Sequence, residues 1–373
     1  MGFPVIPRHS TTLMLAVRTQ LTNQQSVPSV GYKLLMLQRS SKMKFMPNRY
    51  VFPGGVSENT DFSPDWLDLI SHKALPLKPT MTTAPFYESY ANQLPQNSLP
   101  AHIGFRICAI RETFEESGVL LVRLLKDGNN AGSLSIRKVL SDDEVKSWRG
   151  KVHSNASMFM QLCRHIQCVP DIWSLYEWSN WITPAHDCRR RFNTMFYLAF
   201  LDSEPEMSHD GAEVVSSTWM NPADALDLRL TNMLNIAPPQ FYEMCRLCRF
   251  STVDDLKSFV MSLEGVVATE TVAIESSDGD DVYFYPGDDL YEEIKRDTYK
   301  HYENIVDTIP AKDLKRRLPL LKVPQSTQAL LVETKDTTNR LAINFKTSFY
   351  RMNCTAKLKY NMPTPLTPYT AKL

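Results

Sequence analysis

The sequence predicts an α/β fold, because short apolar segments typical of strands occur together with a segment that has the period of a helix. The strand-like segments are rich in Leu, Val, Met and Phe and cover residues 11–17, 32–39 and 194–201. A helix is predicted over residues 102–117, where the apolar stripe consists of Ile103, Ile107, Ile110 and Phe114. A chain of 373 residues with these elements can bury a large core.

Composition and charge narrow the class of protein. The chain carries 41 basic and 41 acidic residues, so no net field attracts it to nucleic acid or to an anionic membrane. Its most apolar stretch, residues 195–201, is too short to span a bilayer. Seven cysteines without dense, regular spacing indicate a reduced compartment. We therefore expect a soluble protein with no nucleic-acid partner and no membrane span.

Three glutamates gather near the end of the predicted helix. Glu112, Glu115 and Glu116 are spaced i, i+3 and i+4, so like charges lie together and repel by roughly 0.2–0.5 kcal/mol per pair. Gly118 is expected to end the helix in the left-handed conformation, which places these charges at the negative end of the helix dipole. A divalent cation would compensate for both effects. A solvated, glutamate-rich surface is the alternative if this stretch is considered alone.

A second stretch, residues 50–55, reads as a short apolar strand that runs into the turn Gly54-Gly55, where backbone can approach a ligand closely. Together the two stretches resemble the signature of the Nudix hydrolases. The second half of that signature is matched by Arg111, Glu112, Glu115, Glu116, Gly118 and Val119, with Thr113 at a normally apolar position. The resemblance implies a Nudix α/β/α sandwich with a mixed sheet.

The first half of the signature departs from the family pattern. After Gly55 and five intervening residues, Asp61 stands where the pattern has Glu, and 49 residues (62–110) then precede Arg111, far more than in the family. The signature is therefore split by an insertion at about 62–101. The insertion opens with a helix start at Ser63 and Pro64 and continues with many prolines. Because it stands between the two halves of one site, we expect it to cover the substrate.

The resemblance also implies roles for individual residues. Glu112 and Glu116 would hold Mg²⁺ or Mn²⁺, and Glu115 would contribute to that ion or to a second one. Arg111 would orient a glutamate by a salt bridge, and the Gly54-Gly55 turn would shape the loop beside the metal. An acidic residue late in the domain often completes the site or serves as base; Glu213 is the candidate and Asp210 its competitor. The expected catalytic residues are Glu115, Glu213 and Arg111.

A narrower resemblance concerns the substrate. The segments that carry it are residues 34–40, 50–55, 178–184, 238–242 and 285–288. They are similar to the peroxisomal coenzyme A diphosphatases, which cleave coenzyme A and acyl-coenzyme A to adenosine 3′,5′-bisphosphate and (acyl)phosphopantetheine. We expect substrate contacts from Gly54, Gly55, Asp61, Arg39 and Arg190. The alternatives are a Nudix enzyme for a dinucleotide or nucleotide sugar and a non-catalytic Nudix-fold binding module.

The sequence also suggests how the chain is divided. A Nudix domain is expected at 10–265, a strand-containing extension at 266–360 and a flexible tail at 361–373. The tail closes with Ala371-Lys372-Leu373, which resembles the Ser-Lys-Leu peroxisomal address. This ending predicts a peroxisomal import receptor as a partner and the peroxisomal matrix as the location. An ordinary frayed terminus is the alternative.

Overall fold

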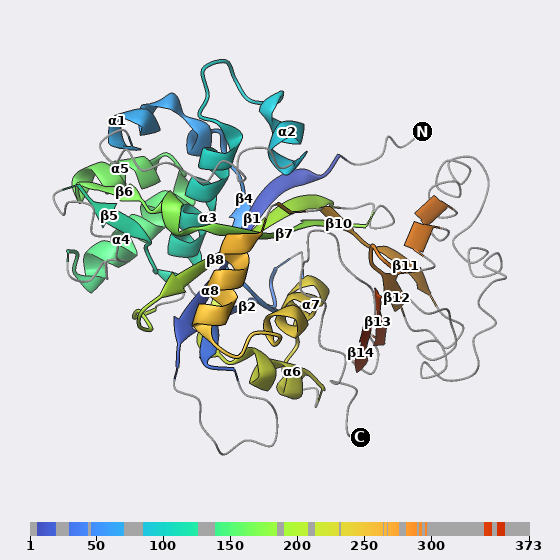
Figure 1. Cartoon of the computed structure of the whole chain (residues 1–373). Helices are drawn as coiled ribbons and strands as arrows, with labels where there is room; N and C mark the ends of the chain where they lie inside the picture. The colour runs from blue at the N-terminus through green and yellow to red at the C-terminus, as the bar shows by residue number, and fades with distance from the viewer. Residues whose placement is uncertain are drawn as a thin grey trace, which may run out of the picture.

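The structure is a computed structural model of the whole chain (Figure 1). It describes residues 6–19, 30–43, 46–70, 85–125, 139–184, 190–207, 213–230, 233–263, 265–266, 268–275, 281–288, 291–292, 295–296, 339–344 and 349–354. The role of Asp210 and the tail 361–373, with its closing address Ala371-Lys372-Leu373, were predicted from the sequence and lie outside these ranges.

A mixed eight-stranded sheet forms the centre of the described part of the molecule. Its strands follow the order β10-β7-β8-β1-β2-β3, with β4 paired to β1 and β9 paired to β2. The pairs β1–β8 and β7–β10 are parallel and the others antiparallel. The strands are β1 (Arg8–Arg18), β2 (Tyr32–Arg39), β3 (Tyr50–Val51), β4 (Gly54–Val56), β7 (Tyr176–Ile182), β8 (Phe192–Leu201), β9 (Val214–Met220) and β10 (Ala268–Glu270).

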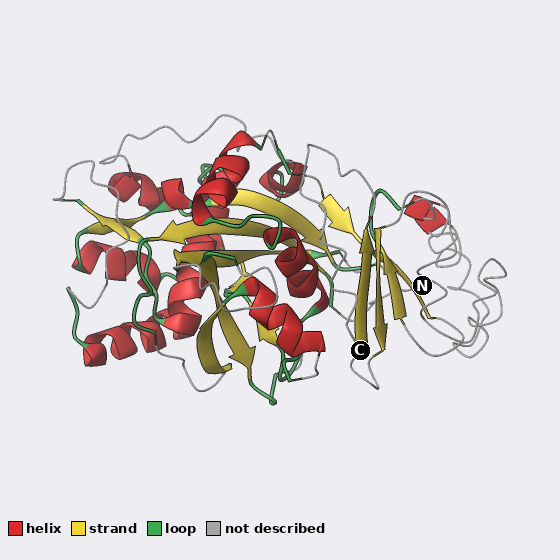
Figure 2. Cartoon of the chain, turned by 60° about the horizontal axis from the view of Figure 1, so that its bottom comes forward, coloured by secondary structure: helices red, strands yellow, loops and turns green. Residues whose placement is uncertain are grey.

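Helices cover both faces of this sheet, as Figure 2 shows. Alternate side chains of β1 point to opposite faces: Leu13 joins one buried core with Ile110 of α3, and Met14 joins another with Phe241 of α7. The first face carries α3 (Ala101–Ser117), α4 (Asp142–Ser154) and α5 (Met158–His165); the second carries α6 (Pro222–Leu230), α7 (Pro238–Leu247) and α8 (Val253–Ser262). The predicted α/β/α sandwich is confirmed.

The long helix α3 ends where the sequence predicts. Gly118 is left-handed, with φ of 74°, and its N–H donates to the Phe114 carbonyl at 2.9 Å. Thr113, which stands at a normally apolar position, is fully buried. Its hydroxyl donates to the Ala109 carbonyl at 2.8 Å, so it occupies that position without an unpaired polar group.

The described part of the insertion packs against α3. Its start is as predicted, because the Ser63 hydroxyl accepts from the Asp65 N–H at 3.3 Å ahead of a short helix with Pro64 at its first position. Two short helical turns, η1 (Asn59–Phe62) and η2 (Pro64–Trp66), lead into α1 (Leu67–Ile70), and α2 (Pro85–Ala91) follows. Phe86 of α2 packs on Phe105 of α3, with ring centroids 4.6 Å apart.

The remaining described strands form two small sheets. One pairs β5 (Val122–Leu124) with β6 (Cys168–Pro170), and a short turn, η5 (Ile172–Ser174), follows. The other contains β11 (Val272–Glu275), β12 (Asp281–Phe284), β13 (Asn339–Asn344) and β14 (Phe349–Cys354). β10 and β11 follow each other closely in the chain, but β10 joins the main sheet and β11 the small one. No helix within the described ranges has the length and apolar character needed to cross a bilayer.

Candidate active site

A cavity of about 870 Å³ opens between the end of α3, the start of α7 and one face of the sheet. Alternate side chains of the two central strands form its floor, namely Arg8, Ser10 and Thr12 of β1 and Phe192, Thr194 and Phe196 of β8. Glu112, Glu115, Glu116 and Glu213 line one corner. The four glutamates singled out from the sequence therefore meet in one place.

Gly54 and Gly55 lie directly against the glutamates of α3; they begin strand β4 and do not form the predicted turn. The Gly54 N–H donates to Glu116 Oε2 at 2.9 Å. Gly54 has a φ of 155°, where only glycine is unstrained, and a Cβ at Gly55 would overlap the Glu112 carboxylate. A Cβ at Gly54 would overlap the Thr11 backbone, so the strand requires glycine there, whereas glycine at Gly55 leaves room for the Glu112 carboxylate. The structure thus reunites the two halves of the split signature.

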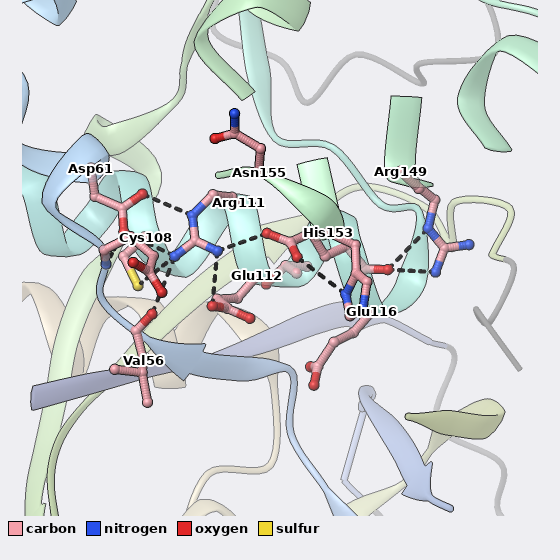
Figure 3. Close-up of polar contacts among 12 residues, drawn as sticks. Val56, Asp61, Cys108, Arg111, Glu112, Glu116, Arg149, His153 and Asn155 are labelled. Carbon is pink, nitrogen blue, oxygen red and sulfur yellow. Dashed lines mark hydrogen bonds and ion pairs between the residues drawn. The ribbon is translucent and has the colours of Figure 1, made fainter. Parts of the chain in front are cut away.

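Arg111 holds two of these carboxylates in place (Figure 3). It is 2% exposed, and its Nη1 donates to Glu112 Oε1 at 2.9 Å and to Glu115 Oε1 at 2.7 Å. Its Nη2 also donates to the Val56 carbonyl at 3.2 Å, which ties it to β4. Arg111 therefore orients two glutamates, as the resemblance implies.

Asp61, which was predicted to contact substrate, is instead directed toward Arg111. Asp61 is 1% exposed and does not line the cavity. Its two oxygens accept from Arg111 Nε at 2.8 Å and Nη2 at 2.9 Å, and Oδ2 also accepts from the Glu58 N–H at 2.8 Å. The short turn η1 directs this side chain inward, so Asp61 supports Arg111 instead of facing a ligand.

The described residues of the insertion do not support the expectation that it covers the substrate. None of those from 61 to 100 lines the cavity; Phe86 and Tyr87 are buried against Phe105, two turns before Glu112 in α3. The Tyr87 hydroxyl donates to Glu177, which also accepts from Arg106 Nη2 at 2.7 Å. The stretch 71–84 lies outside the described residues.

Burial makes the acidic corner unfavourable for negative charge. It raises the pKa of Glu112 to about 7, opposed by Arg111 and reinforced by the charge of Glu115. It also raises the pKa of Glu116 well above its usual value, where the charges of Glu112 and Glu213 act in the same direction. The pKa of Glu115 is raised by burial against the opposing effect of Arg111. A bound cation would offset this cost, because a nearby positive charge favours the ionised form of each carboxylate.

The carboxylates fit a hard cation by chemistry but are not arranged around one. Mg²⁺ takes oxygen ligands and keeps several waters, so two or three carboxylates are sufficient. Among the described residues, no three His, Cys, Asp or Glu side chains converge on a common point. Arg111 binds one oxygen of Glu112 and one of Glu115, and the Gly54 N–H binds one oxygen of Glu116, so the second oxygen of each carboxylate is not used in these bonds.

Two residues of α4 belong to this corner and were missed in the sequence. His153 lines the cavity, with Nδ1 at 3.7 Å from Glu115 Oε2. Arg149 is buried and donates through Nε and Nη2 to the Glu115 carbonyl, at 3.1 and 2.6 Å. The capping box at Ser141 and Glu144 predicted this helix, but no local signal indicates that it packs on α3.

The opposite wall of the cavity is aromatic. Trp181 lies 5.4 Å from Tyr242 and 5.8 Å from Tyr285, between ring centroids, and its Nε1 donates to the buried Glu243 at 2.6 Å. These rings come from the segments 178–184, 238–242 and 285–288, which carried the narrower resemblance. The structure thus explains why these distant segments belong together, since they build one wall.

Arginines line the cavity as well. Arg39 ends β2, and its charge lowers the pKa of Glu116 against the effect of burial. Arg190 precedes β8. Both were predicted to contact substrate, and both line the cavity. Arg8, at the start of β1, lines it too and was missed because nothing in its sequence neighbourhood marks it.

Comparisons with known proteins place this geometry in a family. The family model of the NUDT19 Nudix domain matches residues 7–247. The proteins named acyl-coenzyme A diphosphatase NUDT19 from Xenopus laevis and Gallus gallus are 38% and 41% identical to the chain. The alignments cover 77% and 70% of this chain and 81% and 73% of those proteins. The human protein of the same name is 38% identical, over 71% of this chain and 73% of its own length.

A solved structure agrees on the fold. The crystal structure of a NUDIX hydrolase from Alicyclobacillus acidocaldarius superposes with a TM-score of 0.50 at 19% identity, covering 68% of this chain and 96% of that one. At this identity the likeness speaks for the fold alone. Together with the family match and the glutamates of α3, it leads to one conclusion: the chain belongs to the Nudix hydrolase family, in its NUDT19 group.

Proposed function

We propose that this protein hydrolyses the diphosphate bond of coenzyme A and acyl-coenzyme A, releasing adenosine 3′,5′-bisphosphate and (acyl)phosphopantetheine. One observation carries the proposal: a single cavity joins the acidic corner to arginines and to an aromatic wall. The corner is suited to a diphosphate with its metal, the arginines to further phosphate, and the wall to a less polar arm. The names of the NUDT19 relatives support the same substrate class.

In the proposed reaction the protein side chains would bind the metal ion and keep its ligands in position. Glu112 and Glu116, with Glu115, would hold Mg²⁺ or Mn²⁺, which when bound neutralises a diphosphate and lowers the pKa of a water. Arg111 fixes Glu112 and Glu115 through hydrogen bonds to one oxygen of each carboxylate, and the Gly54 N–H fixes Glu116 in the same way. Glu213, on the same corner, is the candidate to accept a proton from the attacking water.

The products decide between the proposal and its alternatives. Coenzyme A incubated with protein and Mg²⁺ should yield adenosine 3′,5′-bisphosphate and phosphopantetheine by mass analysis, and Glu116→Gln should abolish cleavage. Cleavage of NADH or of a nucleotide sugar without cleavage of coenzyme A would identify a Nudix enzyme of different specificity. Binding of coenzyme A without cleavage of any diphosphate, at any metal concentration, would identify a binding module.

We also propose that the chain is delivered to peroxisomes. The support is the likeness of Ala371-Lys372-Leu373 to the Ser-Lys-Leu address, which an import receptor reads. A fluorescent protein fused ahead of residue 1 should give a peroxisomal pattern in cells. The same fusion without Leu373 should be diffuse, and an unchanged pattern would contradict the proposal.

A further inference from the structure

Arg8 and Arg190 both line one end of the cavity floor. Arg8 begins β1 and pairs in parallel register with Phe192 of β8, while its N–H donates to the Arg191 carbonyl at 2.9 Å. Residues in register in neighbouring strands point to the same face, so the Arg8 side chain shares the floor with Phe192. Arg190 stands two residues before Phe192 and lines the same cavity. Parallel pairing therefore brings together two cations far apart in the sequence.

The neighbouring Arg191 differs from Arg8 and Arg190 because its guanidinium is bonded within the fold. Arg191 donates to Glu270 at 2.8 Å and to the Thr183 carbonyl at 3.1 Å, so its charge is used within the fold. Arg8 and Arg190 are exposed to the cavity, and neither forms an ion pair with any carboxylate among the described residues. Glu58 is an exposed carboxylate that lines the same cavity. The two arginines and this one glutamate together still carry a net positive charge.

The pair lies too far along the strand to serve the reacting diphosphate. Gly54 is in register with Thr12 and Gly55 with Thr11, so the acidic corner stands three to four residues from Arg8 along β1. At roughly 3.3 Å per residue this is about 10–13 Å. This separation leaves room for Arg8 and Arg190 to bind a phosphate group other than the reacting diphosphate.

We propose that Arg8 and Arg190 bind the 3′-phosphate of the adenosine half of the substrate and so fix the direction in which the substrate lies. Guanidinium groups bind phosphate through paired, charge-assisted hydrogen bonds. This inference rests on the proposed coenzyme A diphosphatase activity.

The test compares coenzyme A with dephospho-coenzyme A, which lacks only the 3′-phosphate. The wild type should favour coenzyme A, and Arg8→Gln and Arg190→Gln should each lower the ratio of the two kcat/KM values by about tenfold, mainly through KM. Arg164→Gln, which removes an exposed arginine of α5 that does not line the cavity, should leave the ratio unchanged. A wild type without preference, or variants with an unchanged ratio, would overturn the proposal.

Direct binding separates this inference from the proposed function. If the wild type cleaves neither compound, the proposed activity fails, and calorimetry with adenosine 3′,5′-bisphosphate and AMP then judges the arginines alone. Tighter binding of the bisphosphate, lost in Arg8→Gln and Arg190→Gln but kept in Arg164→Gln, supports the phosphate site. Equal affinity of the wild type for the two nucleotides contradicts it. Thermal melting of each variant shows that it is folded.

Discussion

Asp61 and Arg111 form a two-point ion pair across the whole insertion, with Asp61 oxygens at 2.8 Å from Nε and 2.9 Å from Nη2. In the sequence 49 residues separate Asp61 from Arg111, and this ion pair joins the two ends of that stretch. Because Asp61 occupies one edge of Arg111, the remaining nitrogen Nη1 faces Glu112 and Glu115. The insertion is therefore compatible with an intact acidic corner.

Removing this partner should weaken both the fold and catalysis. Asp61→Ala leaves a buried guanidinium short of its main partner, which costs about 3–5 kcal/mol of unfolding free energy. The free guanidinium edge also lets Arg111 shift away from Glu112, so kcat should fall. Urea denaturation and steady-state kinetics measure the two effects. Asp65→Ala, an exposed carboxylate of the same segment, is the control, and equal behaviour of the two variants would contradict this role.

A methyl group at Gly55 should disable the site without unfolding the protein. The Cβ of Gly55→Ala would overlap the Glu112 carboxylate, so that side chain is pushed from its position. We expect a large loss of kcat/KM and a reduced stabilisation by Mg²⁺ in thermal melting. Gly150→Ala is the matched control, since its Cβ meets nothing within 4 Å in α4 and should stabilise the helix by roughly 0.5–1 kcal/mol. Full activity of Gly55→Ala would show that the contact is unimportant.

The raised pKa of Glu112 predicts a pH dependence of the metal-free protein. Because the folded state holds this proton up to a pKa of about 7 and the unfolded state releases it near 4.5, folding favours protonation. The stabilisation is complete below about pH 4.5 and is lost as pH rises toward 7. Urea unfolding in chelator should show this loss for the wild type, and Glu112→Gln should flatten it. Mg²⁺, which needs the carboxylate, should stabilise the wild type more at pH 8 than at pH 6.

The described part of the insertion should matter for stability and not for substrate choice. Tyr87→Phe removes a buried donor from Glu177 and should lower the unfolding free energy by about 1–3 kcal/mol. Since α2 does not line the cavity, KM for coenzyme A should stay the same. Tyr90→Phe, at a half-buried ring of the same helix, is the comparison. A changed preference among acyl-coenzyme A substrates in Tyr87→Phe would restore the idea of a cover.

Local signals in the sequence determined the parts of the site that depend on one element at a time. The spacing of Glu112, Glu115 and Glu116 follows from the helical period, and the end at Gly118 follows from a backbone conformation that glycine favours. These two predictions succeeded because the governing interactions join residues close in the chain. The turn expected at Gly54 and Gly55 did not form, because both residues pair with β1 at the start of β4.

Tertiary structure alone decided which side chains face one another across elements. Asp61 was expected to face substrate and instead supports Arg111, because a short turn directs it inward. Arg149 and His153 reach Glu115 only because α4 packs on α3, and Arg8 meets Arg190 only because β1 and β8 pair in parallel. Such contacts depend on strand order and helix packing, which the whole core determines and no single stretch of the sequence specifies.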